Sequence, residues 1–210
     1  MTDSPLSRFA APIAIVGGAL VAITRLVSLA IPTELDALKE YVLTVTHAIN
    51  SIGSILAFAL LALALVAAYD HEARPAGTLG VVAFGAAIIG TVFMAGDWWY
   101  EAFAVPRMAE VAPQVMDTFV GGRLLMGGLL SFALFGLSWA LFGIASLRAR
   151  VFPAAISVAI LTGGLVSGIP IGKTYLIGGI VLGVAMVWLG AWMARTTAAT
   201  TTVGESVEAR

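Results

Sequence analysis

The chain has 210 residues, of which 60% are hydrophobic and only 11% are charged. A soluble domain carries roughly 25% charged residues, so this composition excludes a soluble globular protein and predicts an integral membrane protein. The net charge of −1, the lack of any basic tract and the absence of cysteine exclude nucleic-acid binding, disulfides and thiol chemistry. With only two histidines, we expect no metal site and no cofactor.

Six apolar runs are long enough to cross a bilayer, because a hydrocarbon core of about 30 Å needs roughly 20 residues of helix. They comprise residues 9–31, 47–68, 79–105, 120–147, 152–171 and 175–194. Prolines fall at the ends of these runs or between them, and we expect Pro106 and Pro113 to break the third loop. The sequence therefore predicts an all-α, polytopic six-helix bundle.

The two ends of the chain flank this transmembrane domain, which we place at residues 9–195. Residues 1–8 form a short N-terminal tail, and the threonine-rich segment 196–210 has no periodicity, so we expect it to be disordered. The first run could instead be a cleaved signal peptide, since "SLA" at 28–30 has the small-x-small pattern. Arg25 interrupts that run, which favours retention as a membrane helix.

Basic residues in the short connections predict the orientation. With both termini in the cytoplasm, six arginines fall inside and three basic residues fall in the outer loops. The inner residues are Arg8, Arg74, Arg148, Arg150, Arg195 and Arg210, and the outer ones are Lys39, Arg107 and Lys173. This bias, with the alanine- and glycine-rich composition, is typical of a multi-pass protein of a bacterial-type cytoplasmic membrane.

The first outer connection contains a predicted short helix. In "PTELDALKEYVLTVT", Thr33 can cap a helix, and Leu35, Leu38 and Val42 then share one face. Such a segment is typical of a helix that lies at the membrane surface.

Polar residues of four predicted helices fall in the same outer half of the bundle. They are Arg25 in the first helix, His47, Asn50, Ser51 and Ser54 in the second, Asp97 and Glu101 in the third, and Arg123 in the fourth. Ionisable groups at membrane depth are costly and tend to face the bundle interior in pairs. We therefore expect Arg25 and Arg123 to form ion pairs with Asp97 and Glu101.

This neutral set of four charges has two interpretations. It can line a ligand pocket, or it can only fix the register of four helices. Trp98, Trp99 and Tyr100 can be walls of such a pocket or members of an ordinary interfacial aromatic belt. Three consecutive residues spread over about 200° of a helix, so the sequence does not tell which ring faces inward.

Glycines in the predicted helices have a packing role. Small residues four apart let neighbouring helices approach closely. The pairs are Ala86 with Gly90, Gly164 with Gly168, and Gly179 with Gly183. Gly127 and Gly128, with Gly121 and Gly122, can also leave space beside Arg123.

The leading functional hypothesis is a pocket near the outer surface that binds a lipid-like or other amphipathic small molecule. Its ligand-binding residues are Arg25, His47, Asn50, Trp98, Trp99, Tyr100 and Arg123. The alternative is an intramembrane enzyme, an isomerase or cyclase in which Asp97 or Glu101 supplies an acid to an isoprenoid or similar substrate. A small transporter, or a structural subunit whose charges only set helix register, is a further alternative.

Some functions are excluded by geometry. His47 and His71 are separated by roughly 36 Å of helix, so they cannot ligate one haem iron. The expected partners are membrane lipid and a lipophilic small molecule, and a homo-oligomer or a partner subunit remains open.

Overall fold

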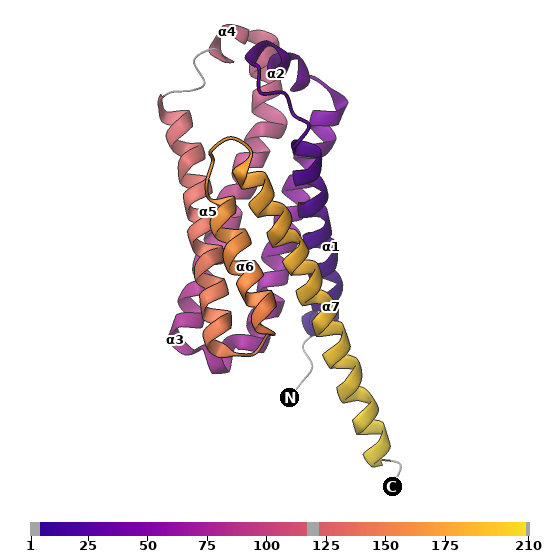
Figure 1. The fold of residues 1–210 in the computed structure, drawn as a ribbon. Coiled ribbons are helices and arrows are strands. Elements are labelled where there is room, and N and C mark those ends of the chain that lie inside the picture. Colours follow the sequence, from indigo (N-terminus) through magenta and orange to yellow (C-terminus); the bar gives the residue numbers. More distant parts are fainter. Residues whose placement is uncertain (1–4, 117–121, 209–210) are drawn as a thin grey trace.

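The computed structural model describes the backbone of residues 5–116 and 122–208, and the side chains of residues 9–69, 75–116 and 122–196. Every regular element in these ranges is a helix (Figure 1). The helices are α1 (Pro5–Ser28), α2 (Leu35–Tyr41), α3 (Val45–Val111), α4 (Pro113–Met116), α5 (Gly122–Ala149), α6 (Ala154–Ser167) and α7 (Thr174–Glu208). The all-α prediction is confirmed for this part of the chain.

Five described segments have the length and composition to cross a membrane, as a multi-pass integral membrane protein requires. They are Phe9–Ser28, Val45–Tyr69, Pro75–Val111, Gly122–Ala149 and Thr174–Thr196. Two of them belong to α3, which folds back on itself at Gly77 (φ 57°, ψ −148°), a backbone conformation open essentially to glycine alone. The predicted separation of the runs 47–68 and 79–105 is therefore confirmed.

The predicted fifth run, 152–171, forms a shorter helix than expected. α6 has 14 residues, roughly 21 Å of helix, because Pro153 precedes its first turn and Gly168 caps its end. Its length is below that of a full bilayer core.

Two other boundaries differ from the prediction. α3 continues through Pro106 to Val111, because the last turns are held by packing: Val105 and Ala109 are buried in a small apolar cluster with Val42 and Met116. The helix in the first loop exists, but Glu34 rather than Thr33 is its N-cap, and no side chain caps it.

The ends of the chain lie largely outside the described part. The backbone of α7 is helical to Glu208, beyond residue 195 where we expected the last helix to end. Residues 1–4, 209 and 210 are not described, nor is any side chain after Thr196. The predicted disorder of 196–210 and the division into 1–8 and 9–195 stay predictions.

The helices form a closed ring around one apolar core. α1 packs against α3 and α7, α3 packs against α5, and α6 lies between α5 and α7. The core is filled by large side chains such as Leu61, Trp139 and Met186, which are fully buried. Leucine, isoleucine and valine also cover much of the outer surface, as expected where lipid replaces water.

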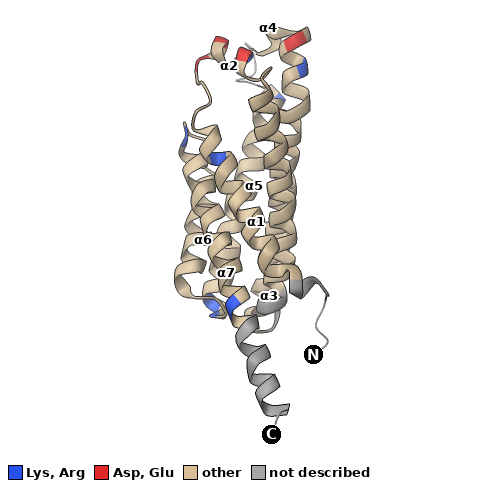
Figure 2. Cartoon of the chain, turned by 90° about the vertical axis from the view of Figure 1, so that its right-hand side faces the viewer, with Lys and Arg blue, Asp and Glu red and all other residues tan. Residues whose placement is uncertain are grey.

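Among the residues whose side chains the structure describes, the charged ones lie toward the two ends of this bundle. Figure 2 shows the carboxylates gathered toward the end that carries α2 and α4, and a long uncharged middle. Figure 2 also shows basic residues toward the opposite end, and Arg148 lies in the last turn of α5. At the α2 end, the Lys173 ammonium donates to the carbonyl oxygens of Leu29 (2.5 Å) and Ile31 (3.4 Å), which ties the α6–α7 turn to the end of α1.

Candidate functional site

Arg25 is the most deeply placed charge of the candidate site. It belongs to the last turn of α1 and is only 4% exposed. Its guanidinium donates a hydrogen bond to the Ser54 hydroxyl and lies 3.9 Å above the centroid of the Trp98 ring, a cation–π contact. Gly179 of α7 leaves room for it, since a Cβ there would come within 2.7 Å of the Arg25 Cγ.

The predicted polar stripe of α3 faces the interior along its whole length. His47, Asn50, Ser51 and Ser54 are all at most 4% exposed. Thr44 starts the helix by accepting a hydrogen bond from the His47 amide (3.2 Å). The i, i+3, i+4, i+7 spacing of the four polar residues then places them on one face of the helix.

His47 and Asn50 link α3 to its neighbours. The His47 Nε2 donates to the backbone oxygen of Glu101 at 2.9 Å, since a carbonyl can only accept. The Asn50 amide donates to the Ser28 hydroxyl of α1 at 3.0 Å. His47 thus joins the two halves of α3, and Asn50 joins α3 to α1.

The three consecutive aromatic residues point in different directions. Trp98 is buried, with 7% exposure, and is the ring that faces inward against Arg25. Trp99 is 57% exposed and packs with Phe103 on the outer surface, where a belt residue would lie. Tyr100 is half-buried and donates to the Met108 sulfur at 3.7 Å.

The expected ion-pair network does not form. No ion pair, with nitrogen and oxygen within 4.0 Å, joins any two of the described residues Arg25, Asp97, Glu101 and Arg123. Arg25 attracts Asp97 only at longer range, because Ser54 and Trp98 hold its guanidinium. Arg123 is exposed in the first turn of α5, beyond a gap between α5 and α3.

That gap is a cavity of about 670 Å³, which we call the wedge. Gly90 of α3 touches α5 closely, since a Cβ there would meet the Ser138 hydroxyl and the Leu134 carbonyl oxygen. Two turns later, a Cβ on Gly96 or on Gly127 would meet nothing within 4 Å. The two helices therefore diverge toward the α4 end, with Asp97, Glu101 and Arg123 at the wedge.

A second cavity of about 360 Å³, here called the chamber, lies on the other side of the two carboxylates. Leu38, Tyr41 and Val42, from α2 and its C-terminal end, line it together with His47. Asp97, Glu101, Phe132 and Pro170 line both the chamber and the wedge. The carboxylates thus stand between two spaces and are reached from either.

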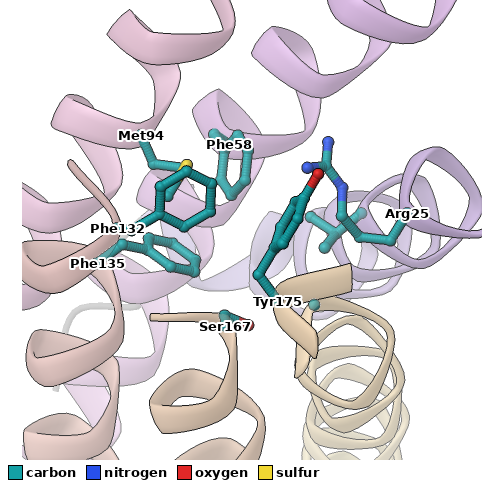
Figure 3. A pocket seen from close by; sticks show the side chains of 9 residues that line it. Arg25, Phe58, Met94, Phe132, Phe135, Ser167 and Tyr175 are labelled. Carbon is teal, nitrogen blue, oxygen red and sulfur yellow. The ribbon is translucent and has the colours of Figure 1, made fainter. Parts of the chain in front are cut away.

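Below the chamber is a cavity of about 10 Å³, at the lower limit for one water molecule. Figure 3 shows the Tyr175 hydroxyl pointing at the Arg25 guanidinium on one side of it. Phe58, Met94 and Phe135 stand on the other side. This apolar floor separates the polar groups from the rest of the core.

Several site residues were not expected from the sequence. Tyr41 packs edge-on against His47, with ring centroids 5.5 Å apart, and Phe132 lines all three cavities. Tyr41 lies in a loop helix and Phe132 in an apolar run, so neither position carries a signal of its own. Tyr175 differs from these two, because its place at the outer turn before the last run, beside Lys173 and Thr174, predicts a polar rim of the site.

Comparison of the chain with protein-family models, with curated proteins and with solved structures finds no match.

Proposed function

We propose that this membrane protein binds an amphipathic small molecule in the outer half of its bundle. The observation that carries the proposal is the wedge, a ligand-sized cavity with charged groups at one wall and leucines at the other. Leu124, Leu125 and Leu130 line it and are exposed on the lateral surface. An apolar tail fits between these side chains, with its polar head at Asp97 and Glu101.

The proposed membrane topology has six crossings: the five long helical segments and the shorter α6, which is the fifth crossing in chain order. Six crossings bring both chain ends to the side that carries Arg148 and Arg195, which the positive-inside rule assigns to the cytoplasm. The wedge and the chamber then open in the outer half, and α2 lies at the outer surface as an interfacial helix.

Unsatisfied polar groups favour a ligand site over a purely structural role for the charges. Asp97 and Glu101 form no hydrogen bond and no ion pair with described residues, so they do not pin the helices together. The Arg25 Nε, the Asn50 Oδ1 and the Trp98 Nε1 are buried without a hydrogen-bond partner in the described structure. Such groups lower stability, which is typical of a site built for binding.

The geometry gives less support to acid catalysis on a carbocation. A cyclase of this kind needs aromatic faces free to stabilise a passing cation. One face of Trp98 is covered by Arg25, and Trp99 points outward. A transport path is not favoured either, since the polar groups lie above an apolar floor.

The proposal is tested by filling the wedge. Gly96→Leu and Gly127→Leu add side chains where no described atom lies within 4 Å, so the fold should tolerate them while the wedge is occupied. Gly85→Leu is the matched control: its Cβ also meets nothing, and it lies on α3 away from both cavities. Mass spectrometry of lipophilic molecules that co-purify with each variant is the measurement.

We expect one molecular species to co-purify with the unmodified chain and with Gly85→Leu, and to be lost from both wedge variants. For a ligand present well below its Kd, a tenfold weaker affinity corresponds to a loss of about 90% of the bound species. Equal retention in all four proteins would contradict the proposal, as would the absence of any bound species.

A further inference from the structure

The charge expected of the ligand follows from which charged side chains at the site already have hydrogen-bond or cation–π partners. Four basic residues lie toward the same end of the bundle as the two carboxylates, and every hydrogen bond that the structure shows for their side chains goes to another group. The Arg25 guanidinium contacts Ser54 and Trp98, the His47 Nε2 donates to a backbone oxygen, and the Lys173 ammonium donates to two carbonyls of the α1 end. Arg123 lines the wedge but not the chamber.

The chamber therefore presents two carboxylates and no basic side chain other than His47. An unpaired carboxylate at membrane depth is costly, and a bound cation would offset that cost. The two acids lie one helical turn apart on the same wall, so a single compact cation reaches both.

Aromatic side chains provide an independent indication of the same chemistry. Tyr41, Phe132 and Tyr175 line the chamber beside Asp97 and Glu101, and Trp98 lines it with one face already covered by Arg25. Aromatic rings combined with carboxylates are the groups that bind quaternary and protonated amines, because ring faces attract cations. Burial raises the pKa of the Tyr41 hydroxyl, so that ring stays neutral at neutral pH.

We infer that the amphipathic ligand is an organic cation, with an ammonium head in the chamber between Asp97, Glu101 and the aromatic rings, and a hydrocarbon chain in the wedge. This inference rests on the proposed function and specifies its substrate class. The ammonium belongs either to a simple cationic amphiphile or to the head group of a zwitterionic phospholipid. In the second case Arg123, at the wedge, is the partner for the phosphate.

Three probes with the same ten-carbon chain test the inference: decyltrimethylammonium, decyl sulfate and decylphosphocholine. The full chain is placed in nanodiscs of a neutral glycolipid, which has no ammonium group, and binding is measured by equilibrium dialysis against empty nanodiscs. We expect decyltrimethylammonium to bind at about one per chain and decyl sulfate to bind at least about tenfold more weakly.

Charge-neutral variants then locate the head group. Asp97→Asn and Glu101→Gln should each weaken decyltrimethylammonium about tenfold, whereas Glu110→Gln, a surface carboxylate paired with Arg107, should leave it unchanged. Decylphosphocholine binding that is lost in Arg123→Gln identifies a phospholipid as the source of the ammonium. Decylphosphocholine that fails to bind identifies the simple cation.

The outcomes separate this inference from the proposed function. If decyl sulfate binds as tightly as the cation, or if both neutral variants keep full affinity for the cation, the ammonium assignment is wrong. The proposed function still stands in that case if Gly96→Leu abolishes binding of the probes. If no probe binds above the empty nanodiscs, both proposals are overturned.

Discussion

At the scale of single residues, the charged groups of the site are of two kinds: one has contacts that stabilise the bundle, and the others have none. Arg25 is enclosed by Ser54, Trp98 and the space left by Gly179. Asp97 and Glu101 border cavities and contact no donor among the described residues. The first is a structural element of the bundle, and the other two are free to interact with a ligand.

Neutralising the carboxylates should therefore not destabilise the protein. We expect Asp97→Asn and Glu101→Gln to leave the free energy of unfolding unchanged or to raise it by up to about 1 kcal/mol, because an uncompensated charge leaves the membrane interior. A register-fixing ion pair would instead cost about 3–5 kcal/mol on loss of one partner. Thermal unfolding in detergent, followed by circular dichroism, distinguishes the two.

Arg25→Lys serves as the contrasting variant in the same measurement. Lysine keeps the charge but lacks the planar guanidinium that stacks on Trp98 while it bonds to Ser54. We expect a lower melting temperature for this variant alone. A drop of similar size in Asp97→Asn would restore the register-fixing hypothesis.

Many residues of the site could be predicted from the sequence, and there is a physical reason why the others could not. The inward stripe of α3 could be predicted because its spacing matches the helical period. The direction of Trp98 could not, since neighbouring residues on a helix face different sides. The absence of the expected ion pairs could not be predicted either. The sequence indicates that the four charged residues lie at a similar depth in the bundle, but it does not show that α3 and α5 diverge and keep them apart.

At the scale of helices, small residues decide where the bundle is tight and where it opens. A Cβ on Gly183 would lie 2.6 Å from the Gly18 carbonyl oxygen of α1, and one on Gly164 would lie 2.6 Å from the Trp139 Cβ. These contacts confirm the predicted packing role of the glycine pairs. Gly96 and Gly127 show the opposite case, because they face open space.

Gly183→Ala should weaken the α1–α7 interface. The added methyl group meets backbone atoms of Gly18 and Ala22, which cannot move aside as a flexible side chain does, so we expect a loss of about 1–3 kcal/mol. Gly85→Ala, with nothing within 4 Å, should be neutral or stabilising by up to about 1 kcal/mol through helix propensity. Urea unfolding of both variants checks this, and equal stability would contradict the tight contact.

Helix boundaries were less predictable than helix existence. Hydropathy located all the long helices, because a membrane span is defined by the length of its apolar run. It overestimated the length of α6, because Pro153 and Gly168 shorten this helix within a continuous apolar run. It also ended α3 too early at Pro106, since the packing of Val105 and Ala109 beneath α2 involves residues distant in sequence.

At the scale of the whole molecule, the ring of helices is closed around the core but splayed at one end. The uncharged middle and the charged ends in Figure 2 match the composition expected of a bilayer-spanning bundle. The number of crossings depends on α6, which has to carry the chain across with 14 residues.

The crossing of α6 can be tested directly because the chain has no cysteine. Single cysteines are introduced at Glu40, at Ile171 in the α6–α7 turn, and at Arg148, then treated with a membrane-impermeant maleimide on intact cells. We expect labelling of Glu40→Cys and Ile171→Cys, and labelling of Arg148→Cys only after the membrane is opened. Protection of Ile171→Cys in intact cells would mean that α6 does not cross.

The divergence of α3 and α5 above Gly90 has a consequence for what determines the occupancy of the proposed site. An entrance in the side of the bundle exchanges with the surrounding leaflet, so occupancy follows the amount of ligand dissolved in that leaflet and not its aqueous level. A molecule that partitions strongly into lipid is then present around the protein at a correspondingly higher local concentration. A modest intrinsic affinity would thus suffice for saturation, and chain length would govern selection as much as the head group does.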